Sequence, residues 1–285
     1  MTKGINMSDA LPIDKFNAKP RPRPAERFPA TVGRFADAND RLIVDSLVRW
    51  VEDQYREDLK KRPSKHVYID KLPVEVTAQV EALRGSEAIR AAMLRHFDAN
   101  SVFTPMRHTD ELYISHYNKD LGGDQGLYSR HYDGNLRFVP FGTVVRALIY
   151  LQSDATYKVV FGDSKVERAF VTYEFGLLDF HRELHWVEGE YNPDDQQRIL
   201  LKCNYLVAPK DTEILSAMVL GANTAVFYIV KAAMEYSKSP ATLAQFVVGL
   251  TCNAMRILNN IHPLVPLGLV AALAGASAWG LLLLF

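Results

Sequence analysis

Two histidines, an aspartate and an arginine stand out in this chain of 285 residues as side chains that could do chemistry together. His131 and Asp133 lie in the stretch YSRHYD, and His185 and Arg198 follow much later. Two imidazoles and one carboxylate are the ligand set that holds non-haem Fe(II) on one face and leaves positions open for other ligands. In an extended strand residues i and i+2 point to the same side, so His131 and Asp133 can bind one ion together. The pattern predicts a metal site, completed by a third ligand from elsewhere in the fold, and therefore an enzyme.

The same pair has a second interpretation. Gly134 follows Asp133 directly, and a histidine and an aspartate beside a glycine are also typical of a surface turn. The third ligand is ambiguous too, because His181 and His185 both come after Phe180.

Charge and cysteine content exclude several other kinds of protein. Lysine plus arginine and aspartate plus glutamate number 33 each, so net charge does not predict nucleic acid as a partner. Two cysteines, Cys203 and Cys252, are too few for a disulfide framework or a cysteine zinc site. We expect no secretory signal, since residues 1–38 are polar, carry the run KPRPRPA and lack an apolar core. This part is predicted to be a flexible Pro/Arg-rich arm.

The C-terminal part is strongly apolar. Residues 263–285 contain no charge and are long enough to cross a bilayer as a helix. Two apolar segments precede them, at 214–230 and 241–258, and Arg256 in the second favours an interfacial or protein-packed helix there. The alternative is that all three segments pack as a helical appendage of a soluble protein.

The first half of the chain predicts helices. Residues 39–62 carry apolar side chains at helical spacing, and Asp40 can cap the start. A short strand is expected at 65–70 and a second amphipathic helix at 73–97. From Glu111 on, short β-rich runs separated by turns predict strands at 112–117, 127–133, 143–152, 158–161, 170–173, 177–180 and 198–207.

Helices in front of many short strands indicate the α+β class. We expect a double-stranded β-helix (jelly-roll) core, supporting N-terminal helices and a C-terminal apolar helical region. The predicted organisation is an arm at 1–38, a catalytic domain at 39–210, and a hydrophobic helical region at 211–285 with a transmembrane segment at 263–285.

On these residues the chain resembles the Fe(II)/2-oxoglutarate-dependent dioxygenases, and within them the prolyl 4-hydroxylase-like branch. The resemblance covers residues 112–207, about one third of the chain. The motifs stand in the family's order: Tyr117 before a glycine-rich loop, YSRHYD, the apolar strand RALIYLQ, then GLLDF, His185, and a terminal strand that begins at Arg198.

The resemblance implies a role for each of these residues. His131, Asp133 and His185 would be the catalytic iron ligands, with His181 a strand-end side chain or a supporting donor. Arg198 would bind the distal carboxylate of 2-oxoglutarate, because a guanidinium can donate two parallel hydrogen bonds to a carboxylate. The gap from His185 to Arg198 is a few residues longer than is typical of the family, so Lys202, on the same strand face, is the second candidate. Tyr117 and Tyr150 would hydrogen-bond the cosubstrate, and Arg130 could contact substrate or form an ion pair at the rim.

The expected activity is hydroxylation of an unactivated C–H bond with Fe(II), 2-oxoglutarate and O₂, giving succinate and CO₂, with ascorbate as an optional reductant. The branch suggests a peptidyl proline or another protein side chain as substrate, and a lipid or small molecule fits the fold equally well. The alternatives are a non-catalytic, membrane-tethered jelly-roll binding module and a cupin-type metal protein without 2-oxoglutarate. We expect membrane association through the C-terminal region, with the catalytic domain in the cytosol and the endoplasmic reticulum as the second location.

Overall fold

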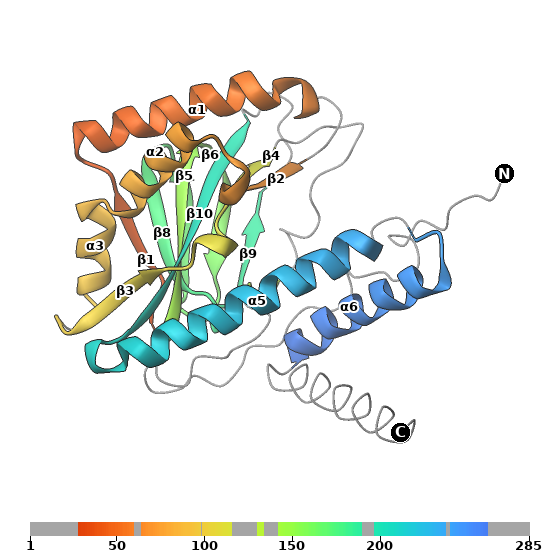
Figure 1. Cartoon of the computed structure of the whole chain (residues 1–285). Helices are drawn as coiled ribbons and strands as arrows, with labels where there is room; N and C mark the ends of the chain where they lie inside the picture. Colours follow the sequence, from red (N-terminus) through yellow and green to blue (C-terminus); the bar gives the residue numbers. More distant parts are fainter. Residues whose placement is uncertain are drawn as a thin grey trace.

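The computed structural model describes residues 28–59, 64–97, 99–115, 130–133, 142–189, 197–237 and 240–261. Within these ranges the chain forms two antiparallel sheets, three helices that cover one of them, and two long C-terminal helices beside this body (Figure 1). The architecture of antiparallel sheets with a few helices agrees with the predicted α+β class.

The larger sheet has seven strands in the described part of the chain. Their order is β1-β8-β5-β10-β4-β2, and β3 also pairs with β10. The strands are β1 (Thr31–Arg34), β2 (Ser64–Tyr68), β3 (Ser101–Pro105), β4 (Glu111–Ser115), β5 (Thr143–Gln152), β8 (Glu174–Asp179) and β10 (Arg198–Pro209). The two long strands β5 and β10 lie side by side and antiparallel to each other in the middle of the sheet.

The smaller sheet has the order β7-β6-β9. Its strands are β6 (Asp154–Phe161), β7 (Val166–Val171) and β9 (His185–Glu188). Apolar side chains from both sheets form one buried cluster, in which Leu148 and Leu200 of the larger sheet meet Val159 and Phe161 of the smaller. The smaller sheet therefore packs on one face of the larger, and an apolar interior lies between the two sheets.

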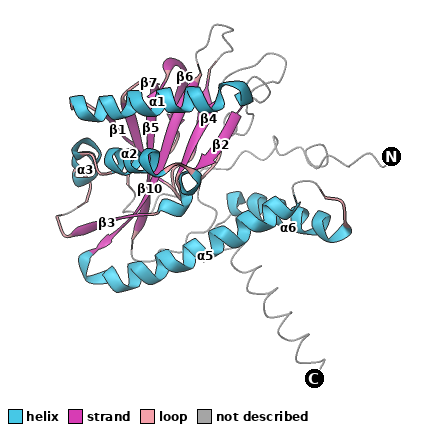
Figure 2. Cartoon of the chain, turned by 45° about the horizontal axis from the view of Figure 1, so that its top comes forward, coloured by secondary structure: helices cyan, strands magenta, loops and turns pink. Residues whose placement is uncertain are grey.

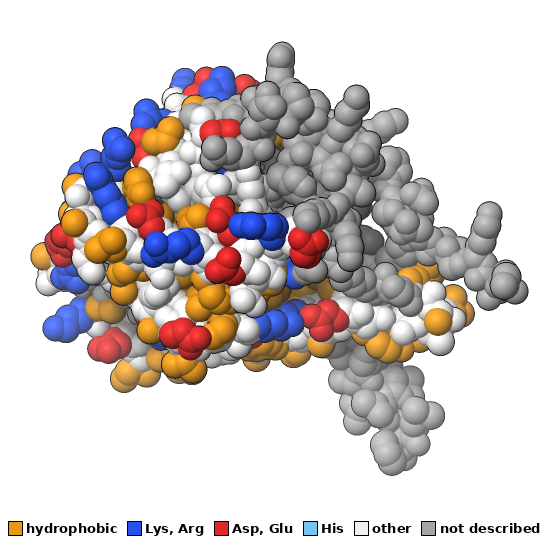
Figure 3. All heavy atoms as spheres, turned by 90° about the horizontal axis from the view of Figure 1, so that it is seen from above, with side chains coloured by type: hydrophobic (Ala, Val, Ile, Leu, Met, Phe, Trp, Pro, Cys, Tyr) orange, Lys and Arg blue, Asp and Glu red, His pale blue; other side chains and the backbone are white. Residues whose placement is uncertain are grey.

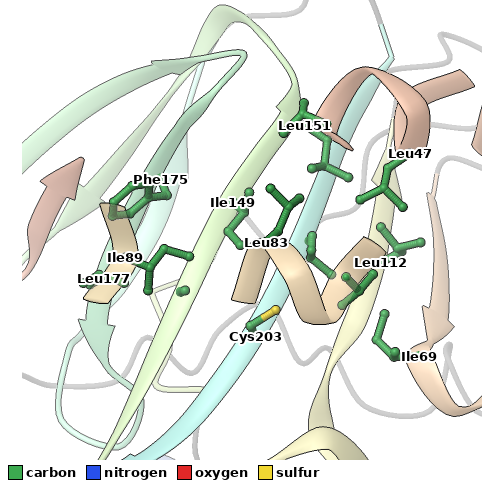
Figure 4. Packing of buried hydrophobic residues seen from close by; sticks show 14 of the residues in the cluster. Leu47, Ile69, Leu83, Ile89, Leu112, Ile149, Leu151, Phe175, Leu177 and Cys203 are labelled. Atoms are coloured by element: carbon green, nitrogen blue, oxygen red, sulfur yellow. The ribbon is translucent and has the colours of Figure 1, made fainter. Parts of the chain in front are cut away.

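Three helices cover the opposite face of the larger sheet (Figures 1 and 2). They are α1 (Ala38–Leu59), α2 (Val74–Arg84) and α3 (Glu87–Leu94). Figure 4 shows their side chains, among them Leu47, Leu83 and Ile89, packed on Ile149 and Cys203 of the central strands.

Alternation along β10 separates these two environments. Leu201 and Cys203 face the helices, whereas Leu200 belongs to the cluster between the sheets because successive side chains of a strand point to opposite faces. Cys203 is fully buried in the hydrophobic layer under the helices. By the same parity Arg198 and Lys202 share the face of Leu200.

The C-terminal apolar segments form two helices, α5 (Glu213–Ser237) and α6 (Leu243–Ile261), which pack against each other. Helix α5 also packs on β10 and on the short helix η4 (Arg107–Thr109) and runs along the body (Figure 2). The predicted segments 214–230 and 241–258 are thus helical, while the predicted transmembrane segment 263–285 lies outside the described residues.

The predicted arm was drawn too long. Residues 1–27 lie outside the described ranges, but 28–38 belong to the body, because Thr31–Arg34 pairs with β8. Phe28 and Phe35 are buried in the core against the helices. Two phenylalanines beside a short run of small residues give a weak strand signal, since the partner strand lies more than a hundred residues away.

Two details of the helices also differ from prediction. The helix expected at 73–97 breaks at Gly85 and Ser86, where the Ser86 hydroxyl caps α3 by accepting from the backbone N–H of Ile89. The start of α1 is capped by Asp37, whose carboxylate accepts hydrogen bonds from the backbone N–H groups of Asn39 and Asp40. The prediction of Asp40 as the cap was therefore wrong by three residues.

Most predicted strands are present. The expected strands at 143–152 and 198–207 correspond to β5 and β10, and β2, β4, β6, β7 and β8 overlap their predicted ranges. The strand expected at 127–133 is not formed in its described part, where His131 makes only an isolated bridge with His185. Strands β1, β3 and β9 were not predicted.

Candidate metal centre

His131, Asp133 and His185 come together in the structure, at the edge of the smaller sheet. Their nearest possible ligand atoms all lie within 4.8 Å of one another. The backbone brings them there, because the amides of His131 and His185 each donate to the other's carbonyl, at 3.1 and 3.0 Å. Strand β9 thus places the third histidine beside the HxD motif across the gap in sequence, and the two imidazole rings lie 4.5 Å apart.

The spacing of the three donors fits one metal ion. His131 Nε2 lies 3.6 Å from Asp133 Oδ1, and His185 Nε2 lies 3.4 Å from Asp133 Oδ2. Ligand atoms about 2.1 Å from a common ion at right angles lie about 3 Å apart. A small inward movement of the side chains would therefore complete a three-sided donor set. It is the single such cluster found in the described part of the chain.

A contact of the ring nitrogen Nδ1, on the far side from Asp133, fixes the orientation of His185. Its Nδ1 lies 3.1 Å from the carbonyl oxygen of Glu183, to which a protonated Nδ1 donates. In the tautomer that carries its proton on Nδ1, Nε2 is free to bind a metal, and it is turned toward Asp133. His181, the alternative ligand, is buried against Phe180 and is not in the donor cluster.

Asp133 is held by an arginine that the sequence analysis did not single out. Arg146 Nη1 lies 2.6 Å from Asp133 Oδ2. Burial alone would raise the pKa of Asp133, but the positive charge of Arg146 and the neighbouring imidazoles outweigh burial and hold this pKa well below its ordinary value. The carboxylate is therefore ionised and ready to bind a cation. Arg146 shares the strand face of Leu148 and Tyr150 on β5, so strand alternation was the signal that could have found it.

Arg198 is buried without an acidic partner in the described part of the chain. Its side chain lies between the rings of Tyr113 and Tyr157, with the guanidinium carbon 5.8 and 5.6 Å from their centroids. Arg198 is only 5% exposed, and its Nε has no hydrogen-bond partner among the described residues. A buried guanidinium in this state is unfavourable unless a ligand supplies the missing acceptor.

Tyr150 lines the same interior from the neighbouring strand. Its ring stacks on Phe170 at 4.2 Å, and burial raises the pKa of its phenol, an effect that the charge of Arg198 partly offsets. The hydroxyl therefore stays a neutral donor near Arg198. Tyr117, the other tyrosine expected at the site, lies outside the described residues.

Lys202, the second candidate for the carboxylate, already has a partner. Its Nζ lies 2.8 Å from Glu111 Oε1, and the other oxygen of Glu111 lies 3.0 Å from His66 Nδ1. Burial would raise the pKa of Glu111, but the charge of Lys202 and the hydrogen bond of His66 lower it strongly. Of the two cations on this face of β10, Arg198 is the one without an acidic partner among the described residues.

Arg130 and Trp186 form the described rim beside the donors. The guanidinium of Arg130 lies 4.4 Å from the centre of the Trp186 ring, whose indole N–H donates to Glu188. Arg130 thus makes a cation–π contact at the rim.

Comparison with known proteins gives similarity in fold and none in sequence family. No family model matches the chain, and no curated protein matches it. Among solved structures, it is similar to the non-heme alpha ketoglutarate dependent epimerase SnoN from nogalamycin biosynthesis, with 13% identity and a TM-score of 0.42 over 63% of this chain and 78% of that one.

Two further structures show the same kind of similarity. A prolyl-4-hydroxylase of Pseudomonas putida has 17% identity and a TM-score of 0.38 over 62% of this chain and 91% of that one. HygX from Streptomyces hygroscopicus, solved with nickel and 2-oxoglutarate bound, has 13% identity and a TM-score of 0.36 over 63% of this chain and 82% of that one.

Proposed function

We propose that this protein is an Fe(II)- and 2-oxoglutarate-dependent oxygenase that hydroxylates an unactivated C–H bond. His131, Asp133 and His185 hold the metal. Arg198 binds the distal carboxylate of 2-oxoglutarate, and Tyr150 and Tyr117 donate hydrogen bonds to the cosubstrate. Succinate and CO₂ are the co-products, and ascorbate serves as an optional reductant that keeps the iron ferrous.

One observation carries the proposal. A three-donor cluster and a buried guanidinium that has no carboxylate partner among the described residues lie on the interior side of the same two sheets. Phe161 connects them, because it packs on Phe170, which stacks on Tyr150, and its ring lies 6.5 Å from the His185 ring on the other side. Metal chemistry alone would explain the cluster, and an anion site alone would explain Arg198. A cosubstrate that chelates the metal through one end and carries a carboxylate at the other explains both.

The side chains of this chain supply geometry and shielding. Bound Fe(II) would supply the activation of O₂ and the oxidative decarboxylation of 2-oxoglutarate, which amino-acid side chains cannot carry out. Three protein ligands on one face leave the remaining positions open for the cosubstrate and O₂. The apolar rings of Phe161 and Phe170 keep bulk water from this interior, and Arg198 orients the cosubstrate by two parallel hydrogen bonds.

The two packed sheets support a double-stranded β-helix as the core fold. In such a core the iron ligands lie at the open end between the sheets, where β9 and the HxD motif meet in this chain. The substrate we propose is a peptidyl proline or another protein side chain, on the motif resemblance of residues 112–207. A lipid or a small molecule is the alternative.

Turnover assays test the proposal directly. Purified protein with Fe(II), ascorbate and O₂ should release succinate from 2-oxoglutarate, and His131→Ala and Asp133→Ala should abolish the release. Succinate formation that persists without metal, or in either variant, would rule the proposal out.

Calorimetry separates the remaining alternatives. A non-catalytic binding module would bind metal and 2-oxoglutarate stoichiometrically without releasing succinate. A cupin-type metal protein would bind metal but show no 2-oxoglutarate affinity that depends on Arg198.

We further infer that the C-terminal region associates with a membrane. The helix at Lys210–Ser237 is long and apolar enough to cross a membrane by length and composition, and 11% of its most apolar window is buried. Its outward side carries exposed Ile214, Met218 and Ile229, and Figure 3 shows hydrophobic side chains with few charges on the projecting end of the molecule.

Contacts with the body favour a helix that lies along the membrane surface. Thr224 lies within hydrogen-bond distance of His108, the Tyr228 hydroxyl lies 3.3 Å from Asp70, and Lys231 lies over the Tyr68 ring. A helix tied to the body over this length cannot be surrounded by lipid on all sides. Segment 263–285 is proposed as the membrane-spanning part, with the catalytic domain in the cytosol and the endoplasmic reticulum as the second location.

A further inference from the structure

We propose that Arg146 is a positioning residue that restricts Asp133 to one metal bond and so keeps a coordination position open. The inference rests on the proposed metal site, but not on the identity of the cosubstrate or substrate. It concerns how the carboxylate binds, since both of its oxygens lie within reach of an ion held between the two imidazoles.

The position of the carboxylate creates the problem that Arg146 would solve. Asp133 Oδ1 lies on the side of His131, at 3.6 Å from Nε2, and Oδ2 lies on the side of His185, at 3.4 Å from Nε2. An aspartate in this position can bind a metal through both oxygens. Two oxygens and two imidazoles would fill four positions of an octahedral ion, leaving too few for a chelating cosubstrate together with O₂.

Arg146 takes one of these oxygens. Its Nη1 lies 2.6 Å from Oδ2, a charge-assisted hydrogen bond. Oδ2 thereby accepts from the guanidinium, while Oδ1 stays free to ligate. A single carboxylate bond leaves three positions open.

Arg146 is itself held on two sides, so it can fix the carboxylate. Asn204, its neighbour on β10, accepts from Arg146 Nε at 2.9 Å. The Asn204 amide in turn donates to the Thr109 hydroxyl at 2.9 Å. The ring of Phe180 covers the guanidinium, with 4.4 Å from its carbon to the ring centre. The larger sheet thus sets the orientation of a ligand that lies near the smaller one.

Charge distinguishes this role from simple ion pairing. Removing Arg146 leaves Asp133 more attractive to a cation, so metal affinity should be retained or increased. The coordination position that Oδ2 would then occupy should no longer be open to water or a cosubstrate. A purely structural role for Arg146 predicts lower stability with unchanged metal coordination.

Water relaxation on bound Mn²⁺ measures the open positions without turnover. In the wild-type protein, Mn²⁺ should carry three exchangeable waters. In Arg146→Met, with Mn²⁺ bound at least as tightly by calorimetry, the inner-sphere relaxivity should fall by about one third, because one water is displaced by Oδ2. Arg146→Lys should restore most of the relaxivity, since an ammonium can also donate to Oδ2.

A matched control is Arg168→Met, which removes an arginine from the ion pair with Glu174 on β7 and β8, away from the donor cluster. Its relaxivity should equal that of the wild type. If Arg146→Met does not fold, Arg146→Leu tests the same point with another side chain that cannot donate a hydrogen bond to Oδ2.

Unchanged relaxivity in folded Arg146→Met would overturn the inference and leave the proposed function intact. Wild-type protein that binds no Mn²⁺ would instead overturn the proposed metal site itself. The two failures are therefore distinguishable.

Discussion

Two buried cations on one strand face behave differently in this protein. Lys202 is neutralised by Glu111, whereas Arg198 has no acidic partner among the described residues. Burying a charge without a partner is unfavourable, so we expect Arg198 to lower the stability of the ligand-free protein. Such a residue is understandable where a ligand brings the opposite charge.

Replacing Arg198 should therefore separate binding from stability. In Arg198→Met we expect the affinity for 2-oxoglutarate to fall on the order of a hundredfold, because a buried charge-assisted pair is lost. Metal affinity should stay the same, and the melting temperature of the ligand-free protein should stay equal or rise. Calorimetry on the Mn²⁺-loaded protein and thermal unfolding measure these quantities.

Lys202→Met is the comparison variant for this prediction. It leaves Glu111 buried without its main partner, so it should lower the melting temperature and change 2-oxoglutarate affinity little. The opposite pattern, with affinity lost in the Lys202 variant and kept in the Arg198 variant, would assign the carboxylate to Lys202.

Sequence reasoning was able to find residues whose chemistry is carried by their own type and spacing. His131, Asp133 and His185 were chosen as a donor set, and the structure brings them within one cluster. Arg146 was missed because strand alternation places it on the interior face but does not identify the groups that it binds. Those partners come from β10 and from the HxD motif.

The same limit applies to elements. The central strands β5 and β10 are long and mostly apolar, so the local pattern predicts them well. Strands β1 and β9 have four residues each, and pairing with a distant partner defines them more than their composition does. Strand β9 matters most, since it carries His185 to His131.

Helix α5 rests on a buried histidine. His108 of η4 lies 3.1 Å from the Thr224 hydroxyl and packs on the Phe227 ring, while its Nε2 is buried without a partner in the described structure. Burial lowers the pKa of His108 below its ordinary value of 6.5. Neutral imidazole is thus the form that the folded protein accommodates.

Acid should weaken this contact. Because the pKa is lower in the folded protein, the unfolded chain binds the proton more readily, and stability present above pH 6.5 is lost as the pH falls below it. We expect the free energy of unfolding to decrease between pH 7.5 and pH 5.5 less in His108→Asn than in the wild type. Urea unfolding at a series of pH values measures this.

His96→Asn serves as control, because His96 also has a lowered pKa but lies far from α5, beside Thr31. That variant should keep the part of the pH dependence due to His108. Superimposable pH profiles for wild type and His108→Asn would contradict the role given to His108.

At the scale of the whole molecule, apolar surface is distributed unevenly. The body carries interspersed acidic and basic side chains, whereas the projecting helices expose hydrophobic ones (Figure 3). Met218 and Ile229 are 68% and 69% exposed on α5. They lie 11 positions apart, close to three helical turns, so they share one side of the helix. If lipid covers this side of α5, burial of the apolar surface of each of these two side chains is favourable.

Environment-sensitive labels on α5 test whether lipid covers it. In a Cys252→Ser background, nitrobenzoxadiazole on Met218→Cys or Ile229→Cys should gain intensity and shift to the blue when anionic phospholipid vesicles are added, because the dye moves from water into the acyl boundary. The same dye on Leu42→Cys of α1, at a position 64% exposed, should not respond. Labels on α5 that respond no more than the label on α1 would show that this side stays in water, even if segment 263–285 anchors the protein. A response without vesicles that grows with protein concentration would instead mean that the apolar side joins two copies of the chain.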